Sequence, residues 1–308
     1  MLVPVTDLAI IHEHPQWFQP LFAALDRAGI VWEAIHTEGH MFDPLAGAPP
    51  APVIFNRVAM SSFLRAAEHP IFYTQALLDH WEGLGAVVLN GAGAMAIDAS
   101  KARQLALISR LGFAAPATRV VHDRGALVRA AALVGFPLVI KADIGGAGAG
   151  IMRFDTPAQL AAAVDQGATP DSVNGVVLVQ ALVPRRNNVI TRVEMLGGRY
   201  LYALDIQSGA DTFDLCPADA TESGRPPVHM VRAEPPPGVI TACEMLAREA
   251  GMEACGIEYM IDDRCGTPRF YDINGLSNFV ANPMDVLGWD PHDRLVARLA
   301  EIIRRAKG

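Results

Sequence analysis

The sequence predicts an α/β protein of 308 residues, with packed lobes and an α+β arrangement in the C-terminal lobe. Apolar runs of strand length alternate with Ala-rich stretches of helical periodicity, and 51% of the residues are hydrophobic, as is typical of a globular α/β protein. A chain of this length also exceeds the size at which one hydrophobic core usually keeps growing. We therefore expect several lobes, and the pattern of elements divides the chain into three.

The first lobe covers residues 1–98 and begins as a βαβ unit. An apolar run, an amphipathic stretch and a second apolar run follow one another, which is the order of strand, helix and strand. A connection rich in Pro, Ala and Gly over 44–52 separates this unit from the rest of the lobe. The expected strands cover residues 7–11, 30–35, 53–57 and 86–90, and the expected helices cover 15–28 and 71–83.

The second lobe covers residues 99–184. Its first helix is followed by Gly112, a residue type that commonly ends helices. A later strand ends in Lys141 and leads directly into a glycine-rich loop. The expected helices cover residues 99–111, 124–134 and 157–166, and the expected strands cover 118–122, 137–141 and 176–180.

The third lobe covers residues 185–308 and is mainly antiparallel. Its first two strands flank Gly197-Gly198, a dipeptide that favours a tight hairpin turn. A loop with many polar and Pro residues is expected over about 208–237. The expected strands cover residues 189–196, 199–206, 256–261 and 268–274, and the expected helices cover 239–250 and 291–305.

Charge and hydropathy make two classes of partner unexpected. The chain has 25 Lys and Arg against 33 Asp and Glu, a formal net charge of -8, and no basic block that could follow a nucleic-acid backbone. No apolar run reaches the roughly 18–20 residues that span a bilayer, and the N-terminus has no basic segment before an apolar one. We expect a soluble, cytoplasmic protein that binds neither nucleic acid nor membrane.

The four cysteines have no CxxC spacing, which indicates neither a zinc site nor a disulfide framework. They are Cys216, Cys243, Cys255 and Cys265. We expect plain thiols, most of them buried.

A lysine and a glycine loop form the first group that could do chemistry. Lys141 closes an apolar strand, where a buried cation is costly unless an anion meets it. The glycines that follow allow backbone N–H groups to approach phosphate oxygens closely; they are Gly145, Gly146, Gly148 and Gly150. The alternative is a flexible hairpin turn with its lysine at the surface. No Gly-Lys-Ser/Thr follows, so a Walker-type phosphate loop is disfavoured.

Three oxygen-bearing side chains form the second group. If Asp262 pairs with Pro268 around a five-residue loop, Glu258 falls opposite Asp272, and Asn274 lies on the same face. Two carboxylates facing each other repel, and a bound Mg²⁺ would reverse that repulsion. The alternative is a solvated polar face.

Arg192 and two histidines are further candidates. Arg192 lies on the strand after Asn187-Asn188, where it could stabilise charge on a transferring phosphoryl group, although surface arginines are common. His12 and His14 lack the HExxH spacing of a zinc site and stand at a strand end, which in an α/β sheet faces a ligand cleft.

Residues 87–96 offer a competing interpretation. They resemble a strand followed by G-x-G-x-x-A, the dinucleotide fingerprint, with Gly91 and Gly93 as the first two glycines. The motif lies mid-chain, however, and no acidic residue stands about 20 positions beyond it. A nicotinamide-dependent oxidoreductase is therefore the weaker alternative.

Taken in order, these residues resemble the ATP-grasp superfamily, and within it the ribosomal-protein glutamate ligases and related carboxylate–amine ligases. The resemblance runs from about residue 90 to 277. Lys101 and Lys141 are similar to the two ATP lysines of the family, and residues 177–183 look like the strand and hinge that hold adenine. Arg192 matches the family's phosphate-facing arginine. Glu258, Asp272 and Asn274 stand where the family keeps its magnesium ligands.

The resemblance implies an ATP-grasp fold with an N-terminal pre-ATP-grasp α/β lobe, and a ligase that forms an amide through an acyl phosphate. It implies ATP and one or two Mg²⁺ ions, replaceable by Mn²⁺, with catalytic roles for Arg192 and Lys141. The implied substrates are a small-molecule or peptide carboxylate and an amine, and a homo-oligomer is compatible with these features. The implied nucleotide-binding residues are Lys101, Lys141, Gly145, Gly146, Gly148, Gly150, Gln180, Ala181, Leu182, Val183 and Asn188.

The chain departs from the family pattern at several positions. Ala181 replaces a common hinge Glu, Asp272 replaces a more usual Glu, and residues 204–206 lack the arginine of many glutamate ligases, which puts glutamate in doubt as substrate. His12, Asn56 and Arg57 would contribute to the acceptor pocket. The main alternative is a protein of the same fold that binds ATP without ligating anything.

Overall fold

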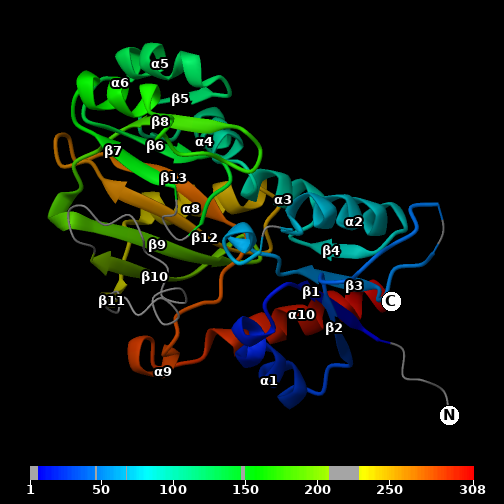
Figure 1. Cartoon of the computed structure of the whole chain (residues 1–308). Helices are drawn as coiled ribbons and strands as arrows, with labels where there is room; N and C mark the ends of the chain where they lie inside the picture. Colours follow the sequence, from blue (N-terminus) through cyan, green and yellow to red (C-terminus); the bar gives the residue numbers. More distant parts are fainter. Residues whose placement is uncertain (1–5, 46, 67, 147–149, 208–228) are drawn as a thin grey trace.

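The computed structural model describes residues 6–45, 47–66, 68–146, 150–207 and 229–308, and these residues form three sheets (Figure 1). The strands of each sheet lie within one of the three expected lobe ranges. The lobe boundaries themselves stay a prediction.

The first sheet has four parallel strands in the order β2-β1-β3-β4. All five residues of β1 are buried, because a parallel strand covered on both faces carries apolar side chains on both. Its strands are β1 (Leu8–His12), β2 (Trp32–His36), β3 (Val53–Asn56) and β4 (Val87–Leu89). Its helices are η1 (Pro15–Phe18), α1 (Gln19–Arg27), η2 (Ser62–Leu64), α2 (Ile71–Gly83) and α3 (Ala92–Asp98), where η marks a 3-10 helix.

Helix α3 was not among the expected helices, and it contains Gly93, a residue type of low helix propensity. The strand before it is shorter than expected. It ends at Leu89, since Asn90 has a positive φ of 51° that a strand does not accommodate.

The second sheet has four antiparallel strands in the order β5-β8-β6-β7. Within β6, Leu138 and Ile140 pack with helices α5 and α6, and the strand period of two directs Val139 and Lys141 to the other face. Strand β7 was not predicted, because it is short and half exposed. The strands are β5 (Thr118–Val121), β6 (Leu138–Ala142), β7 (Ile151–Phe154) and β8 (Val177–Ala181), and the helices are α4 (Lys101–Arg110), η3 (Arg124–Ala126), α5 (Leu127–Val134) and α6 (Pro157–Asp165).

The third sheet has five antiparallel strands in the order β11-β10-β9-β12-β13. Its strands are β9 (Val189–Leu196), β10 (Arg199–Gln207), β11 (His229–Ala233), β12 (Ala254–Ile261) and β13 (Pro268–Asn274). The helices in this part of the chain are η4 (Arg186–Asn188), α8 (Pro237–Glu249), α9 (Pro283–Val286) and α10 (Pro291–Lys307). The expected loop over 208–237 is thus wrong at its end, where β11 pairs with β10, and residues 208–228 lie outside the described residues.

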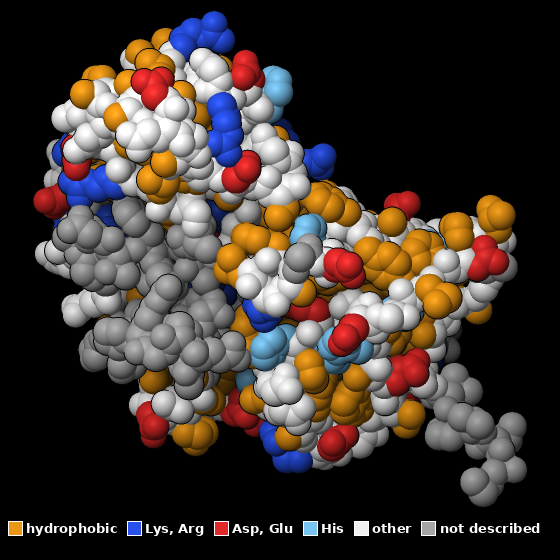
Figure 2. All heavy atoms as spheres, viewed as in Figure 1, with side chains coloured by type: hydrophobic (Ala, Val, Ile, Leu, Met, Phe, Trp, Pro, Cys, Tyr) orange, Lys and Arg blue, Asp and Glu red, His pale blue; other side chains and the backbone are white. Residues whose placement is uncertain are grey.

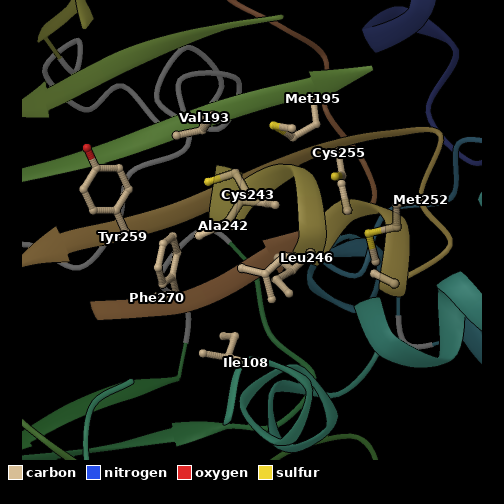
Figure 3. Close-up of a cluster of buried hydrophobic side chains, with 14 of the residues drawn as sticks. Ile108, Val193, Met195, Ala242, Cys243, Leu246, Met252, Cys255, Tyr259 and Phe270 are labelled. Carbon is tan, nitrogen blue, oxygen red and sulfur yellow. The ribbon is translucent and has the colours of Figure 1, made fainter. Parts of the chain in front are cut away.

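One face of the third sheet forms the largest hydrophobic cluster (Figure 3). Val193 and Met195 of β9 point into it together with Cys243 and Leu246 of α8. Arg192 and Glu194, which alternate with Val193 and Met195 along β9, therefore belong to the opposite face.

The cysteines of the described chain are free thiols. Cys243 and Cys255 are buried in this cluster, as expected, whereas Cys265 is exposed in the turn between β12 and β13. Cys216 lies outside the described residues.

Two helices pack against a sheet from a different part of the chain. Leu107 and Ile108 of α4, which precedes the second sheet in sequence, join the core of the third sheet. Leu295 and Leu299 of α10, at the end of the chain, join the core of the first sheet, and Figure 1 shows α10 beside α1 and β1. Through these two helices, residues from different lobes share the same hydrophobic cores.

Asn90 joins the first sheet to the third. Its side-chain amide donates to the carbonyl oxygens of Ala254, at 2.8 Å, and Gly275, at 2.6 Å. Its side-chain oxygen accepts from the N–H groups of Glu253, at 2.7 Å, and Ala254, at 3.3 Å. All the hydrogen-bonding groups of one buried amide are thus used to join two sheets.

The helices and the surface charges can be compared with the predictions about membranes and nucleic acid. Among the described residues, no helix is both long and apolar enough to cross a membrane. Acidic and basic side chains are interspersed over the face shown in Figure 2, which presents no basic stripe.

Candidate functional site

The second and third sheets, together with helices and a connection of the N-terminal part, line a cavity of about 490 Å³, a size typical of small-molecule sites. Most of the predicted site residues line it: Lys101, Lys141, Gly145, Gly146, Gln180, Ala181, Leu182, Val183, Arg192, Glu258, Asp272 and Asn274. Gly150 and Asn188 do not line it, and Gly148 lies outside the described residues. The sequence motifs therefore converge on one place, except at these positions.

The two lysines enter the cavity from different elements. Lys101 begins α4 after the N-cap Ser100, and its ammonium group bonds to the carboxylate of Asp272. Burial alone would lower the pKa of Lys101, but the charge of Asp272 raises it. Lys141 is only 5% exposed, and burial, together with the charge of Lys101, lowers its pKa to about 8. An added anion would therefore stabilise charged Lys141 more than Lys101, which already pairs with Asp272.

Glu258 and Asp272 face each other across β12 and β13, as predicted. The premise for that prediction was wrong by one residue, because Ile261, not Asp262, pairs with Pro268. A register shift between Glu258 and Tyr259 compensates for the difference and restores the predicted pair.

The amide of Asn274 lies on the same face, with Nδ2 at 3.5 Å from Oε1 of Glu258. Burial raises the pKa of Glu258, and the facing Asp272 raises it further. Burial would also raise the pKa of Asp272, but Lys101 and Lys141 hold it below its ordinary value. Lysines therefore compensate the charge of Asp272, whereas the cation that contacts Glu258 is Arg192.

These three side chains fit a hard divalent cation. Within the described ranges, no three His, Cys, Asp or Glu residues are grouped so as to hold a metal ion. The candidate set therefore consists of two carboxylates and one amide, Glu258, Asp272 and Asn274. Oxygen donors of this kind, with one or two carboxylates, are those with which proteins bind Mg²⁺.

Arg192 connects the carboxylates to the rest of the site. Its Nε donates to Glu194 at 2.6 Å, and its Nη1 lies 3.3 Å from Oε1 of Glu258. The guanidinium crosses directly over Gly256, where any Cβ would collide with it. Gly256 in the Gly-Ile-Glu sequence thus provides space for the arginine.

The predicted adenine hinge is fixed by hydrogen bonds within the protein. The N–H of Ala181 donates to Ala117 at 2.8 Å, and the N–H of Leu182 donates to Pro137 at 3.0 Å. The Gln180 side chain donates to Thr118 Oγ1 at 2.9 Å. The hinge is therefore held in place on both sides.

The sequence did not single out every lining residue. Asp98, at the end of α3, lines the cavity and packs on Gly275, and burial raises its pKa to about 7. Tyr271 also lines it and donates to Glu258 at 2.8 Å. Tyr271 directly precedes Asp272, and neighbouring strand residues normally face opposite sides, so the strand pattern did not indicate that both would line the cavity. Nothing in the sequence around Asp98 indicated a site.

The expected acceptor-pocket residues do not line the cavity. His12 is buried among Phe18 and Phe22, and burial lowers its pKa to about 4, so it is an uncharged core residue. Arg57 is buried and donates to the carbonyl of Ser277, and Asn56 bonds to backbone groups of the same core. His14 stacks on Trp17.

The dinucleotide interpretation conflicts with the local geometry. A carboxylate oxygen of Glu82 accepts from the N–H of Ala92 at 2.9 Å and lies against Gly91. It thus covers the start of α3, where a pyrophosphate would have to bind. This observation disfavours the nicotinamide-dependent alternative.

Comparisons with known proteins add two relatives in sequence. No family model matches the chain. A probable alpha-L-glutamate ligase of Pectobacterium carotovorum is 30% identical over 145 residues, which are 46% of this chain and 46% of that protein. A second protein of that name, from Serratia proteamaculans, is 27% identical over 212 residues, 62% of this chain and 69% of that protein. The first match thus spans less than half of the relative's length.

Solved structures resemble the chain over nearly its whole length. The ATP-grasp ligase PsnB, complexed with minimal precursor, Mg and ADP, has a TM-score of 0.70 at 17% identity, covering 98% of this chain and 99% of that one. D-cycloserine synthetase DcsG has a TM-score of 0.70 at 18% identity, covering 96% and 99%. D-alanine–D-alanine ligase from Bacillus anthracis, complexed with ATP, has a TM-score of 0.66 at 14% identity, covering 98% and 98%. The predicted ATP-grasp fold and the resemblance to the glutamate-ligase branch are confirmed.

Proposed function

We propose that this chain, which has the ATP-grasp fold, is an ATP-dependent carboxylate–amine ligase that works through an acyl phosphate. One observation carries the proposal: two lysines and an arginine meet two facing carboxylates in a single cavity. Cations placed this way would neutralise the phosphates of ATP, and the carboxylates would hold its metal ion. The named ligases with this fold support the same reaction class.

In the proposed reaction, a carboxylate oxygen of the acid attacks the γ-phosphorus of ATP, and ADP leaves. The amine then attacks the acyl carbon, its nitrogen loses a proton, and orthophosphate leaves with the electron pair of the broken C–O bond. Lys141 and Arg192 would stabilise the negative charge that develops on the transferring group. Mg²⁺, when held by Glu258, Asp272 and Asn274, would neutralise phosphate charge.

Other parts of the cavity would bind and shield the nucleotide. Residues 180–183 would hold the adenine, and Lys101 would bind phosphate. The glycine loop that begins at Gly145 would cover the phosphates and exclude water, which would otherwise hydrolyse an acyl phosphate. One or two metal ions, and replacement by Mn²⁺, are both part of this proposal, as are small-molecule or peptide substrates.

Product analysis tests this function. With a suitable acid and amine, the protein should release ADP and orthophosphate, because the proposed lysines, arginine and metal ligands would stabilise γ-phosphoryl transfer. Hydroxylamine in place of the amine should trap the acyl phosphate as a hydroxamate. AMP and pyrophosphate during turnover, in an assay free of contaminating kinases, would contradict the proposal. ATP binding without any turnover would favour the non-catalytic alternative.

A further inference from the structure

The cavity has a charged part and an apolar part. Its charged lining residues, in the described chain, come from α3, α4, β6, residue 185 and the third sheet. Another part is lined by three segments: residues 16–20 of η1 and α1, residues 59–61, and residues 276–281, which follow β13. The described lining residues of these segments carry no charge. The polar ones are Gln16, Ser61, Ser277 and Asn278, and the larger apolar ones are Trp17, Pro20, Met60, Leu276 and Phe279.

The apolar part adjoins the candidate metal site. Leu276 follows the candidate ligand Asn274 by two residues, and the same segment is tied to the first lobe by the bond from Arg57 to Ser277. The glycine loop reaches the connection 59–61, since a Cβ on Gly146 would lie 2.6 Å from Cβ of Ser61. A substrate carboxylate placed at the metal site would therefore direct its substituent towards this end.

Phe279 has an unusual backbone conformation. Its φ is 57°, which is uncommon for a bulky residue and occurs where the surrounding structure imposes it. Its N–H donates to Ser277 Oγ at 3.1 Å, and the next N–H, of Val280, donates to the hydroxyl of Tyr202 at 3.1 Å. These bonds fix an aromatic side chain on the wall of the cavity.

Trp17 is held in place as well. The Arg65 guanidinium lies 4.5 Å from the centre of a Trp17 ring, and Arg65 donates to Glu13 at 2.6 Å. Glu13 also accepts from the N–H of Ala59 at 3.2 Å. The nearby arginine is thus neutralised by a carboxylate and packs on the tryptophan, so it does not present a charge to a second carboxylate.

We propose that the acid activated by this protein carries an uncharged, apolar substituent, which binds between Trp17, Met60 and Phe279. The inference rests on the proposed ligase function and names its substrate class. Burying apolar groups against these walls is favourable, whereas an anionic substituent there would lose its hydration and would contact no cation among the residues that line these segments. A dicarboxylic acid such as glutamate is therefore disfavoured.

Two matched pairs of acids test the inference: leucine against glutamate, and 4-methylpentanoate against glutarate. Affinity is measured by calorimetry with Mg²⁺ and a non-hydrolysable ATP analogue present, and ADP release is measured with ATP and hydroxylamine. In at least one pair, the apolar acid should bind at least about tenfold more tightly than the dicarboxylate, the scale on which apolar pockets discriminate. A preference for the dicarboxylate, or no binding of either apolar acid, would overturn the inference.

Substitutions test whether the preference for an apolar acid arises from this part of the cavity. Met60→Arg adds a cation to the apolar wall and should reduce the preference at least about tenfold, while the affinity for the ATP analogue stays within about twofold. Met41→Arg is the matched control, because Met41 is 84% exposed and does not line the cavity, and it should change neither quantity. If Met60→Arg does not fold, Trp17→Ala should weaken binding of the apolar acid without changing binding of the dicarboxylate. Equal effects on both acids would contradict the inference.

The two proposals fail in different ways. If an apolar acid binds but no ADP is released, the ligase function is wrong and the pocket assignment stands. If ADP is released only with glutamate or glutarate, the ligase function stands and the pocket assignment is wrong.

Discussion

Replacing Lys141 with Met should weaken ATP binding and, at the same time, stabilise the protein without ATP. Lys141 is 5% exposed, and none of the ion pairs within the described residues includes it. Its ammonium group lies 5.7 Å from the centre of the Tyr271 ring. A buried cation of this kind is unfavourable in the free protein and favourable once an anion arrives.

The pKa of Lys141 gives the size of the effect on stability. It falls from 10.5 to about 8, chiefly through burial and then through the charge of Lys101. At about 1.36 kcal/mol per pKa unit, the charged form destabilises the free protein by on the order of 3 kcal/mol. The Met side chain has a similar length and no charge, so the variant should recover this free energy and melt a few degrees higher.

The loss of ATP affinity follows from the same charge. A hydrogen bond to a charged group contributes about 1.5–3 kcal/mol, so ATP should bind about 10- to 100-fold more weakly to the Met variant. Calorimetric titration with MgATP measures the affinity, and thermal unfolding without nucleotide measures stability. Lys307→Met is the matched control: Lys307 is at the chain end and pairs with Asp7, so ATP affinity should not change.

The pH dependence of stability provides a second check. The folded protein releases the Lys141 proton near pH 8, whereas the unfolded chain keeps it up to about 10.5. Between these values the unfolded state binds more protons, so the free energy of unfolding should rise with pH in the wild type relative to the Met variant. An unchanged ATP affinity together with an unchanged melting temperature would refute the phosphate-binding role of Lys141.

Three further predictions concern the metal site, the glycine loop and the connection between sheets. Asp272→Asn with Asn274→Ala should raise the half-saturating Mg²⁺ concentration in the ADP-release assay at least about tenfold, and overlapping metal curves would exclude this hairpin as the metal site. Gly146→Ala should raise the KM for ATP at an unchanged melting temperature, because its Cβ would collide with Ser61; Ser61→Gly should restore it, and failure to do so would contradict the contact. Asn90→Ala should lower stability by about 3 kcal/mol in urea unfolding, since it leaves buried backbone groups in and beside the third sheet unpaired, and an unchanged midpoint would count against that connection.

Local sequence rules predicted what lies within a hairpin or a strand. Glu258 and Asp272 could be paired from the sequence because a short loop limits the possible registers. The assumed register was nevertheless wrong by one residue at the loop. The bulge that corrected it leaves no reliable mark in the sequence, because it depends on how β12 and β13 twist against their neighbours.

Tertiary packing determined what the sequence did not reveal. Helix α10 is clearly amphipathic, but nothing in its sequence specifies that its apolar face packs on the first sheet rather than on the third. Trp17, Met60 and Phe279 share no motif, and they come together only because distant segments meet at one cavity. Single apolar residues at protein surfaces are common, so the sequence alone could not distinguish the apolar end of the site from ordinary surface.

The charges in the cavity explain why its ligands should bind together. In the protein alone, Lys101 neutralises Asp272, and Arg192 is shared between Glu194 and Glu258. If a phosphate pairs with Lys101, Asp272 loses its counterion. If a metal cation pairs with Asp272, Lys101 is left buried without a counterion. Either ligand alone therefore exposes an uncompensated buried charge, whereas both together supply a partner for each. The arrangement favours binding of the nucleotide–metal complex over binding of either component alone. The sequence motifs indicated which residues would meet, but not how their charges would be paired.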